Sequence, residues 1–368
     1  MMRIGIDAQA ATGQLTGLGT YTKHLIAALT GQSEIPAVFT KPPFEFHFYA
    51  DERYGTNTPS RIYWENWVLP QRIKKDGLQL LHVPAFAPAM FPRMKTVVTA
   101  HDLIGMLFPN QIGRASRFYW GRWLPAALKR ADALIADSES TRRDLIEHLR
   151  VPERKITVIY PSGHEGFTAS VSAQMLAQVK TKHGLDTPYF LFVGTIEPRK
   201  NLSRVIGAVE RLKKSGKAGG ARLVVVGSKQ FAHGAFFQQL GKSMSGAMDE
   251  IIFTGYVTRA ELNSLYCGAA ALVYPSLYEG FGIPILEALG SGCPVITANV
   301  SSTPEVAGEA ALQVDPLDES QIAAAMERML SDASLRQKLK RAGAEQIKKF
   351  SWEKTAQQTL QVYKTLLV

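Results

Sequence analysis

The sequence predicts an α/β protein with two doubly wound domains, each built on a parallel sheet that helices cover on both faces. Three observations support this fold class. Short β-branched or aromatic runs alternate with segments of helical periodicity. The alternation forms two separate series, as expected for two parallel sheets. The chain has 368 residues, enough for two domains at roughly 150 residues each.

The first series of runs predicts the sheet of an N-terminal domain, for which we expect the bounds 1–170. Each run has the length of a strand and is followed by a turn or by a segment with helical periodicity. The expected strands are Ile4–Ile6, Phe44–Tyr49, Leu80–Val83, Thr96–Ala100, Leu134–Ala136 and Thr157–Tyr160.

The second series predicts the sheet of a C-terminal domain over residues 186–350. Helical patterns separate its strands, for example over Asn201–Lys214 and Gln321–Leu330. The expected strands are Tyr189–Val193, Arg222–Val226, Ile251–Phe253, Ala270–Tyr274, Val295–Thr297 and Leu312–Val314.

Two further segments lie outside the series. Residues 171–185 read as a linker region, with a helix over Ala173–Lys182 that ends before Gly184. The last segment begins with the capping residue Ser351 and continues with near-helical apolar spacing. It predicts a closing helix over 352–368, which we assign to the first domain although periodicity alone does not say where it packs.

Composition places the chain among soluble globular proteins. Apolar residues make up 46% and charged residues 20% of the sequence. No apolar run reaches the roughly 18 to 20 residues of a membrane span, and the start lacks a signal-peptide layout. The two cysteines, Cys267 and Cys293, form no CxxC pair, which favours a reducing compartment and argues against structural zinc. We therefore expect a cytoplasmic protein.

The formal net charge is +10, and the basic excess is spread evenly over both halves of the chain. A basic surface favours anionic partners, which include nucleic acid, nucleotides and anionic lipid headgroups. Charge alone does not choose among these three.

The first candidate loop contains Gly17 and Gly19. It resembles the start of a dinucleotide fingerprint, but Thr22 occupies the position of the third glycine and the usual acidic residue is missing. A glycine pair that opens a helix still lets backbone amides approach an anion or a sugar. An ordinary strand-to-helix turn is the alternative.

The segment Gly194-Thr195-Ile196-Glu197-Pro198-Arg199-Lys200-Asn201 follows the first expected strand of the second domain. Two adjacent cations at the start of a helix oppose the helix dipole, and a bound anion would remove this conflict. Arg199 offers a forked pair of donors and Lys200 a point charge, both suited to a diphosphate. A solvated charged cap is the simpler alternative.

The strongest motif is Glu279-Gly280-Phe281-Gly282-Ile283-Pro284-Ile285-Leu286-Glu287, between the strand that ends at Tyr274 and a helix. Pro284 suits the first turn of a helix. Gly280 and Gly282 leave amides free to face an oxygen-rich ligand, and the two glutamates can face one cleft in different roles. A single glutamate would not indicate a binding site, because glutamates are common on protein surfaces.

These residues resemble the E-x7-E signature of retaining glycosyltransferases of the GT-B fold, in particular glycosyltransferase family 4. The resemblance extends over nearly the whole chain and is densest in Tyr189–Pro316. It includes Gly194–Asn201, Thr254-Gly255-Tyr256, Ser301–Val306 and Phe350–Glu353. It implies two Rossmann-like domains, the first for the acceptor and the second for the nucleotide sugar, with the site in the cleft between them.

The resemblance also implies roles for individual residues. Glu279 would contact the donor sugar, Glu287 the ribose, and Arg199 and Lys200 the diphosphate, with amides near Gly282 and Ile283 assisting. The backbone of Tyr256 and Val257 would meet the base. His101 matches a histidine that lies over the donor sugar, although by itself it reads as an ordinary loop residue. The catalytic set expected from the resemblance is His101, Glu279, Arg199 and Lys200; the donor-binding set is Gly17, Gly19, Thr195, Tyr256, Val257, Gly280, Phe281, Gly282, Ile283 and Glu287.

The chain departs from the family at two places. Thr195 stands where many relatives have Arg, which removes one cation from the diphosphate site, and Gly163–Phe167 matches its family motif loosely. No DxD, HExxH or metal-spaced His and Cys cluster occurs in the sequence. We therefore expect neither a metal nor another cofactor, with the leaving diphosphate stabilised by fixed cations and a helix N-terminus.

Four of the five tryptophans lie in two basic segments of the first domain. These segments are Arg61–Lys75 with Trp64 and Trp67, and Arg114–Arg130 with Trp120 and Trp123. Aromatic and basic residues together favour peripheral contact with an anionic inner-membrane surface. Stacking on an acceptor sugar and ordinary core packing are the alternatives. No RNP, KH or zinc-finger pattern supports nucleic acid as a partner.

The sequence thus predicts a cytoplasmic, metal-independent, retaining glycosyltransferase. It would move a hexose from a nucleoside diphosphate sugar, with mannose from GDP-mannose as our first choice, to a glycan or polyprenyl-diphosphate-linked acceptor of cell-surface polysaccharide or lipopolysaccharide. A UDP-glucose or UDP-N-acetylglucosamine transferase, or a UDP-sugar 2-epimerase on the same architecture, is the alternative. A nicotinamide-dependent oxidoreductase would need the missing third glycine and acid.

Overall fold

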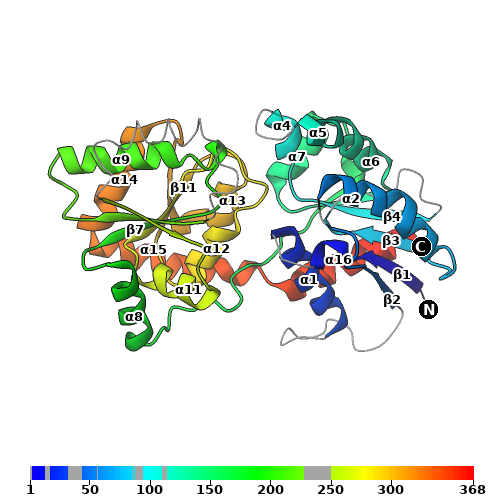
Figure 1. The fold of residues 1–368 in the computed structure, drawn as a ribbon, viewed down its shortest axis with the longest axis horizontal. Coiled ribbons are helices and arrows are strands. Elements are labelled where there is room, and N and C mark those ends of the chain that lie inside the picture. The colour runs from blue at the N-terminus through cyan, green and yellow to red at the C-terminus, as the bar shows by residue number, and fades with distance from the viewer. Residues whose placement is uncertain are drawn as a thin grey trace. The chain divides into compact units, whose positions relative to one another are not determined.

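The computed structural model describes residues 2–12, 17–31, 44–55, 57–85, 87, 94–109, 114–227 and 250–368. The chain divides into two compact units, each with its own sheet (Figure 1). The first unit comprises Met1–Pro161 together with Phe350–Val368, and the second comprises Ser162–Lys349.

The first unit contains a parallel sheet of six strands among the described residues, in the order β2-β1-β3-β4-β5-β6. The order reverses between β1 and β3, so this sheet is doubly wound. Its strands are β1 (Met2–Asp7), β2 (Phe44–Tyr49), β3 (Leu80–Val83), β4 (Lys95–Ala100), β5 (Ala133–Ala136) and β6 (Ile156–Val158).

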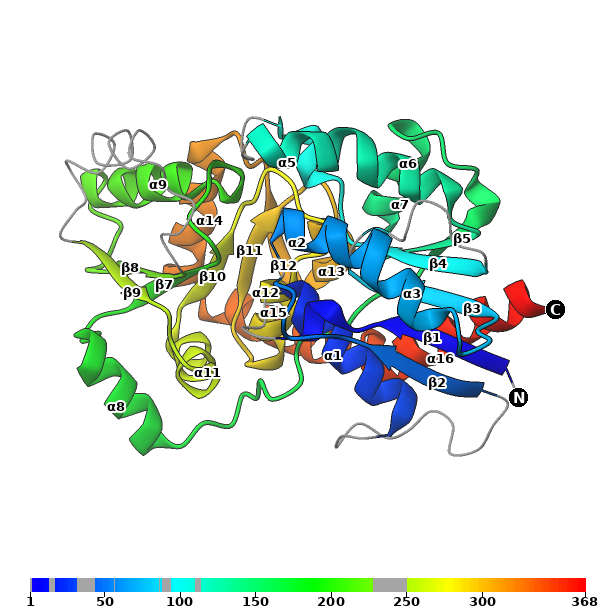
Figure 2. The same cartoon turned by 45° about the vertical axis from the view of Figure 1, so that its right-hand side comes forward.

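Helices cover both faces of this sheet. On one face α1 packs beside α16 through a cluster that includes Leu25 and Leu360, and both views of the fold show these two helices close to β1 (Figures 1 and 2). The other face carries a cluster centred on Trp64 and Tyr119. The helices are α1 (Gly17–Thr30), α2 (Thr58–Tyr63), α3 (Leu69–Ile73), α4 (Ile104–Leu107), α5 (Arg114–Phe118), α6 (Leu124–Arg130), α7 (Glu139–Glu147) and α16 (Trp352–Leu367).

The second unit contains a parallel sheet in the order β12-β11-β10-β7-β8-β9. Relative to the first strand of the unit this is the 3-2-1-4-5-6 order of dinucleotide-binding sheets, and it reverses between β7 and β10. The strands are β7 (Tyr189–Val193), β8 (Arg222–Val226), β9 (Ile251–Gly255), β10 (Ala271–Tyr274), β11 (Val295–Ala298) and β12 (Ala311–Val314).

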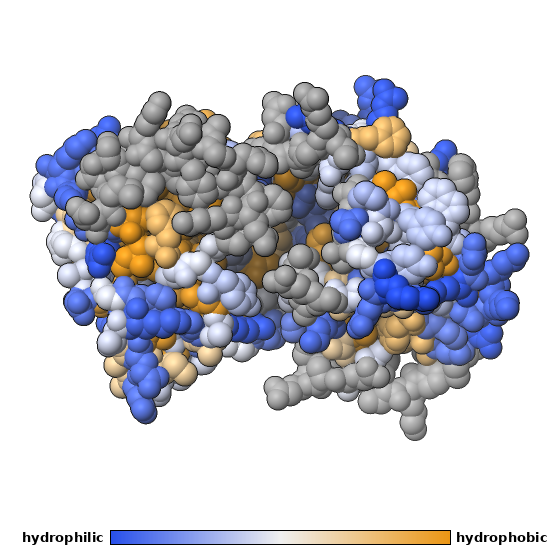
Figure 3. All heavy atoms as spheres, viewed as in Figure 1, coloured by the Kyte–Doolittle hydropathy of each residue, from blue (hydrophilic) through white to orange (hydrophobic). Residues whose placement is uncertain are grey.

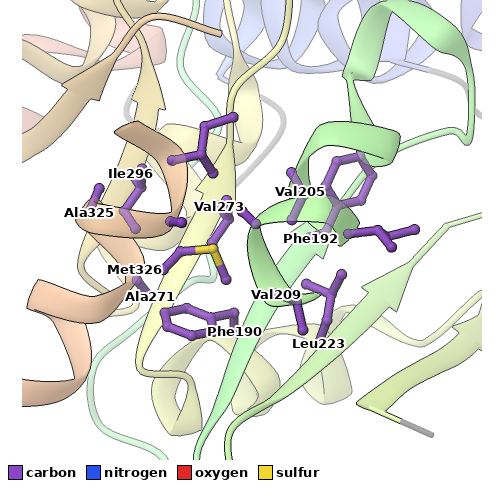
Figure 4. Packing of buried hydrophobic residues seen from close by; sticks show 14 of the residues in the cluster. Phe190, Phe192, Val205, Val209, Leu223, Ala271, Val273, Ile296, Ala325 and Met326 are labelled. Carbon is purple, nitrogen blue, oxygen red and sulfur yellow. The ribbon is translucent and has the colours of Figure 1, made fainter. Parts of the chain in front are cut away.

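The core of the second unit lies between this sheet and the helices α9 and α14. Phe190, Val205, Val273 and Met326 meet there from four different elements (Figure 4). All five residues of β7 are buried, as expected for a central strand of a sheet covered on both faces. The helices are α8 (Ala173–His183), α9 (Leu202–Lys214), α11 (Arg259–Gly268), α12 (Ile283–Gly290), α13 (Thr303–Ala307), α14 (Glu319–Ser331) and α15 (Ala333–Gln346).

The border between the units differs from the expected linker at 171–185. The second unit begins at Ser162. Within it α8 packs on α11, and the α8 side chains Lys182 and His183 donate to Glu261 at 2.7 and 2.8 Å. The segment is therefore part of the second unit. At the other end of the chain, α16 belongs to the first unit.

The four tryptophans of the basic segments have different environments. Trp64 is fully buried, and Trp120 and Trp123 pack against the same core cluster, so core packing accounts for these three. Trp67 is 53% exposed and stacks on Tyr63. The side chain of Arg114 lies outside the described part of the structure.

In the space-filling view, apolar areas show between hydrophilic side chains on the visible face (Figure 3). None of the described helices combines the length and the apolar character that a bilayer span requires.

Candidate functional site

The candidate site of the second unit lies at the point where the strand order of its sheet reverses. The loop that follows β7 and the loop that follows β10 leave neighbouring strands at the same edge. The amide of Leu277 donates to the carbonyl oxygen of Arg199 at 2.8 Å, which joins the two loops directly. Ligands of open α/β sheets bind beyond the carboxyl ends of strands at such a reversal. The two strongest sequence motifs are therefore brought together where this fold binds ligands.

Two glycines allow the strand ends to approach closely. Gly194 and Gly227 directly follow β7 and β8, with φ values of 143° and 154°, in the region that favours glycine. A Cβ on Gly227 would lie 1.9 Å from the carbonyl oxygen of Gly194. Glycine at position 227 is thus required by the backbone itself, a requirement that the sequence alone did not reveal.

Lys200 and Glu279 form an ion pair in the centre of the site. The Nζ atom of Lys200 lies 2.7 Å from Oε1 of Glu279 and 2.7 Å from the hydroxyl of Tyr274. That hydroxyl in turn donates to Oε1 of Glu279 at 2.8 Å. The Lys200 ammonium also lies 5.0 Å from the centre of the Tyr274 ring, within range of a cation–π interaction. Tyr274 therefore holds both charged groups.

Arg199 is buried, and protein groups engage its guanidinium. Its Nη1 donates to the carbonyl oxygen of Tyr278 at 2.6 Å and lies 2.9 Å from Oε2 of Glu279. Its Nη2 pairs with Glu197. A buried guanidinium needs such partners because an unpaired buried charge is costly. The forked donors that we expected for a diphosphate are directed at the protein here, so diphosphate contact by Arg199 stays a prediction.

Glu279 is held as a carboxylate. Burial opposes ionisation, but the charges of Lys200 and Arg199 and the hydrogen bond from Lys200 outweigh it and lower the pKa of Glu279 to about 2. The loop around it is fixed by two serines that follow β11. Ser301 exchanges hydrogen bonds with the Glu279 backbone, and Ser302 donates to the carbonyl oxygens of Glu279 and Phe281. The serine motif of the sequence therefore supports the glutamate loop.

Glu287 has a different environment, one turn into α12. Gly282 caps this helix with a φ of 109°, and Pro284 lies in its first turn as expected. The Tyr266 hydroxyl donates to Glu287 Oε2 at 2.9 Å. Burial raises the pKa of Glu287 to about 7, against the opposing effects of this hydrogen bond and the Arg259 charge. The carboxyl group is therefore poised to ionise near neutral pH.

The remaining expected residues of the second unit follow β7, β9 and β10. Thr195 and Gly280 lie in the loops after β7 and β10, and Phe281 and Val257 are buried. Ile283 is the first residue of α12. Tyr256 is 88% exposed directly after β9, so its ring is accessible as well as its backbone.

In the first unit, His101 and the glycine pair lie at the same end of the sheet. Gly17 and Gly19 fall in the first turn of α1, which confirms that the pair opens a helix. Tyr21, in the next turn, has its ring centre 4.6 Å from that of His101 in an edge-to-face arrangement. His101 follows β4 and is paired with Asp137, which follows β5.

Sequence reasoning missed Tyr274, Tyr266 and Asp137. Tyr274 is the last residue of the strand before the glutamate loop, so its position was a usable signal. The partner of Tyr266 is Glu287 in α12, and that of Asp137 is His101 in the loop after β4. One sequence without the strand order does not pair these residues.

Comparison with protein families matches both halves of the chain. Residues 15–162 match the family model described as Glycosyltransferase Family 4, and residues 176–346 match the model described as Glycosyl transferases group 1.

Individual proteins show the same relation. O-antigen chain mannosyltransferase B of Escherichia coli is 31% identical over 272 residues, covering 74% of this chain and 71% of that protein. O-antigen chain mannosyltransferase RfbU of Salmonella typhimurium is 31% identical over 322 residues, covering 83% and 84%.

Solved structures show the fold. The structure of HepE from Anabaena in complex with UDP and glucose aligns with a TM-score of 0.74 at 16% identity, covering 99% of this chain and all of that one. With the two doubly wound sheets and both family matches, these comparisons establish that the chain belongs to glycosyltransferase family 4 and has the GT-B fold.

Proposed function

We propose that the protein is a retaining hexosyltransferase that transfers mannose from GDP-mannose to a glycan acceptor. The observation that carries this proposal is the cluster of Lys200, Arg199 and Glu279 at the strand reversal of the second sheet. It combines two cations for a diphosphate with a fixed carboxylate for sugar hydroxyls, at the place where nucleotides bind in this type of sheet.

The two cations would stabilise the leaving diphosphate without a metal ion. Charge that develops on the leaving group is best met by donors that are already in place. Lys200 is held by Tyr274 and Glu279, and amides at Gly282 and Ile283 begin α12, whose dipole favours an anion. Arg199 would bind the diphosphate if one of its N–H donors turned away from the protein oxygen to which it now donates.

Glu279 is suited to binding the sugar and poorly suited to attacking it. Its charge is shared with Lys200 and Arg199, which lowers its nucleophilicity but leaves it able to accept hydrogen bonds from hydroxyl groups. We propose that the acceptor hydroxyl attacks from the face that the diphosphate leaves, with no covalent protein intermediate. The bond from the sugar carbon to the diphosphate oxygen breaks as the new glycosidic bond forms, and the hydroxyl proton passes to the departing diphosphate oxygen. Glu287 would bind the ribose, and the backbone at Tyr256 and Val257 the base.

The choice of mannose rests on the relatives. Both proteins at 31% identity are named O-antigen chain mannosyltransferases, which also supports a role in polysaccharide or lipopolysaccharide biosynthesis. An acceptor of this kind would be a growing glycan, carried on a polyprenyl diphosphate. The roles of His101, Gly17 and Gly19 toward the donor stay predictions from the resemblance.

A thermal-shift panel of UDP, GDP, ADP and dTDP and their sugars tests the donor site, because a ligand that binds only the folded protein raises its melting temperature. We expect the largest shift with GDP and GDP-mannose. A largest shift with a UDP sugar would replace the donor by UDP-glucose or UDP-N-acetylglucosamine. If no nucleotide shifts the transition, the donor site is wrongly assigned.

Product analysis separates transfer from isomerisation. With donor and no acceptor, a transferase leaves the sugar nucleotide largely intact, whereas a 2-epimerase releases an epimerised sugar. We expect Glu279→Ala to abolish transfer and to retain nucleotide binding, with Glu345→Ala, an exposed glutamate, as the control. Normal turnover by Glu279→Ala would refute its assigned role.

We also propose that the first unit contacts an anionic membrane from the cytoplasmic side. Tyr63, Trp67 and Phe118 are 52%, 53% and 60% exposed, and Arg117 and Arg122 are exposed beside Phe118 in the sequence. Exposed aromatic and cationic side chains of this kind suit headgroup depth. Vesicle sedimentation tests it: we expect Trp67→Ser to weaken binding to anionic vesicles, and a wild-type protein that never sediments with them contradicts the proposal.

A further inference from the structure

The ring of His101 lies between two hydrogen-bond acceptors. Nδ1 is 2.6 Å from Oδ2 of Asp137, and Nε2 is 2.7 Å from the carbonyl oxygen of Pro84. A carbonyl oxygen only accepts, so Nε2 must carry a proton. A second proton must lie between Nδ1 and Asp137, because two acceptors without a proton would repel each other at this distance. The pair therefore holds two protons.

The second proton belongs to the imidazole. An ordinary histidine binds a proton more tightly than an ordinary aspartate by roughly 2.6 pKa units. Asp137 directly precedes Ser138, the N-cap residue of α7, where the helix dipole favours a negative charge. The geometry thus corresponds to an imidazolium paired with a carboxylate.

The other groups near His101 fit a cation there. Burial lowers the pKa of His101, but the charge and hydrogen bond of Asp137, the bond to Pro84 and the charge of Asp102 outweigh burial, so the net shift is upward. His82 is neutral near pH 7, since burial and the His101 charge lower its pKa to about 3. The Tyr21 ring meets the His101 ring in an edge-to-face arrangement. Tyr21 is also neutral, because burial and the Asp137 charge raise its pKa.

Within the described part of the chain, His101 is the hydrogen-bond and ion-pair partner of the Asp137 side chain. Asp137 is 4% exposed, and its Oδ1 makes no hydrogen bond to the described part of the chain. The segment that carries it also fixes the His101 backbone: Thr141, bound through its amide to Ser138, donates its hydroxyl to the carbonyl oxygen of His101 at 3.1 Å. One short segment thus holds the ring and the carbonyl group of a single histidine.

We propose that Asp137 is a positioning residue that keeps both ring nitrogens of His101 protonated and so maintains a fixed cation at the carboxyl edge of the first sheet. The use of this cation in sugar transfer rests on the proposed function. Its protonation is a property of the first unit alone and can be measured without any substrate.

Nitrogen-15 NMR of the histidine rings tests the protonation in the whole 368-residue chain, with His101→Gln to assign the signal. In the wild type we expect both His101 nitrogens to have imidazolium shifts at pH 7 and the ring to titrate above 6.5. In Asp137→Asn, which keeps the shape and removes the charge, we expect titration at least one pH unit lower. Asp144→Asn, the same change farther along α7, should leave the curve unchanged.

A wild-type ring that is neutral at pH 7 overturns the proposal, and this measurement needs no variant to fold. An unchanged curve in a folded Asp137→Asn protein also overturns it.

Activity tests the use of the cation separately. We expect Asp137→Asn to move the alkaline limb of the kcat/KM profile down by at least one pH unit, while the thermal shift with nucleotide stays as in the wild type. If the Asp137→Asn substitution lowers the pKa of the His101 ring but leaves the alkaline limb of the kcat/KM profile in place, the cation has no use in catalysis. A wild-type protein that transfers no sugar refutes the proposed function. The NMR titration curves would still test whether Asp137 keeps His101 protonated.

Discussion

Glu279 and Glu287 are eight residues apart in one motif, yet their surroundings move their pKa values in opposite directions. Glu279 is buried against two cations, which lower its pKa to about 2, whereas Glu287 is buried against a tyrosine hydroxyl and its pKa rises to about 7. A hydroxyl stabilises a carboxylate far less than a paired cation does. The motif therefore supplies one permanent anion and one carboxyl group that titrates near neutral pH.

We predict that Glu287→Gln stabilises the protein at pH 8 and weakens nucleotide binding. The raised pKa means that the folded state binds this proton more tightly than the unfolded state, so the wild type loses stability as pH rises from about 4.5 through about 7. Glutamine cannot ionise and avoids this loss, by about 1 to 3 kcal/mol. Nucleotide affinity should fall roughly 10- to 100-fold, as hydrogen bonds to a charged group are lost.

Urea unfolding at pH 5 and pH 8 measures the stability change, and isothermal titration with nucleotide measures the binding. Glu345→Gln, the same change at an exposed side chain, should show neither effect. A stability difference that is equal at the two pH values would contradict the role of the Glu287 proton.

We predict that Tyr274→Phe raises the KM for the donor about 3- to 10-fold with a smaller change in kcat. The ring would remain under Lys200, but the hydroxyl that joins Lys200 to Glu279 would be lost, at a cost of about 1 kcal/mol. Tyr189→Phe is the matched control, since its buried hydroxyl donates to the Leu265 carbonyl oxygen from the first residue of β7. Equal KM changes in the two variants would show that the Tyr274 hydroxyl has no specific role in donor binding.

At the scale of elements, the hydrophobic pattern located all twelve expected strands to within two residues at their ends. Phe44–Tyr49, Leu80–Val83, Tyr189–Val193 and Arg222–Val226 agree with β2, β3, β7 and β8 at both ends. Tyr189–Val193 is a continuous apolar and aromatic run, Leu80–Val83 and Arg222–Val226 are mostly apolar, and Phe44–Tyr49 alternates aromatic with polar residues. Local chemistry therefore defines these strands. The order of strands in each sheet depends on long-range packing, and periodicity does not encode it.

The same limit applies to the candidate site. The sequence predicted that Lys200 and Glu279 each follow the end of a strand. The strand order then explains why the two side chains meet. The burial of Arg199 and the pairing of His101 with Asp137 depend on which loop lies beside which, and so they required the structure. The π-helical turns at Trp64–Val68 and Tyr119–Trp123 were also hidden, because their apolar spacing resembles that of an α-helix.

We predict that Gly17→Ala folds normally and that any loss of activity reports on ligand contact. Gly17 is the first residue of α1, its φ is not positive, and a Cβ there would meet nothing within 4 Å. Alanine is the better helix former, so stability should be equal or higher by up to about 1 kcal/mol. Gly105→Ala is the contrasting variant, because its Cβ would lie 2.3 Å from Trp120. Thermal melts and kinetics with the donor check both variants. A Gly17→Ala protein with full activity would show that this loop is an ordinary turn without a role in ligand binding.

At the scale of the whole molecule, the chain leaves the first unit after Pro161 and returns to it at Phe350. The returning helix α16 completes the core of the first unit: Leu360 and Tyr363 are buried there, and the Tyr363 hydroxyl lies 2.5 Å from Nδ1 of His82. The first unit is therefore incomplete until α16 has been made, whereas the second unit is one continuous segment.

This division predicts that core substitutions in the two units have different effects on nucleotide binding. Leu360→Ala in α16 and Leu272→Ala in β10 both remove buried side chains, 1% and 0% exposed, and each should destabilise its unit by about 2 to 5 kcal/mol. Leu360→Ala should keep the nucleotide affinity of the wild type, since Lys200, Arg199 and Glu279 all belong to the second unit. Leu272→Ala should lose affinity, because Leu272 lies in the strand that ends at Tyr274 and leads into the Glu279 loop. Calorimetry gives the stabilities and isothermal titration below the first transition gives the affinities; equal losses of affinity in both variants would show that the donor site depends on the first unit as well.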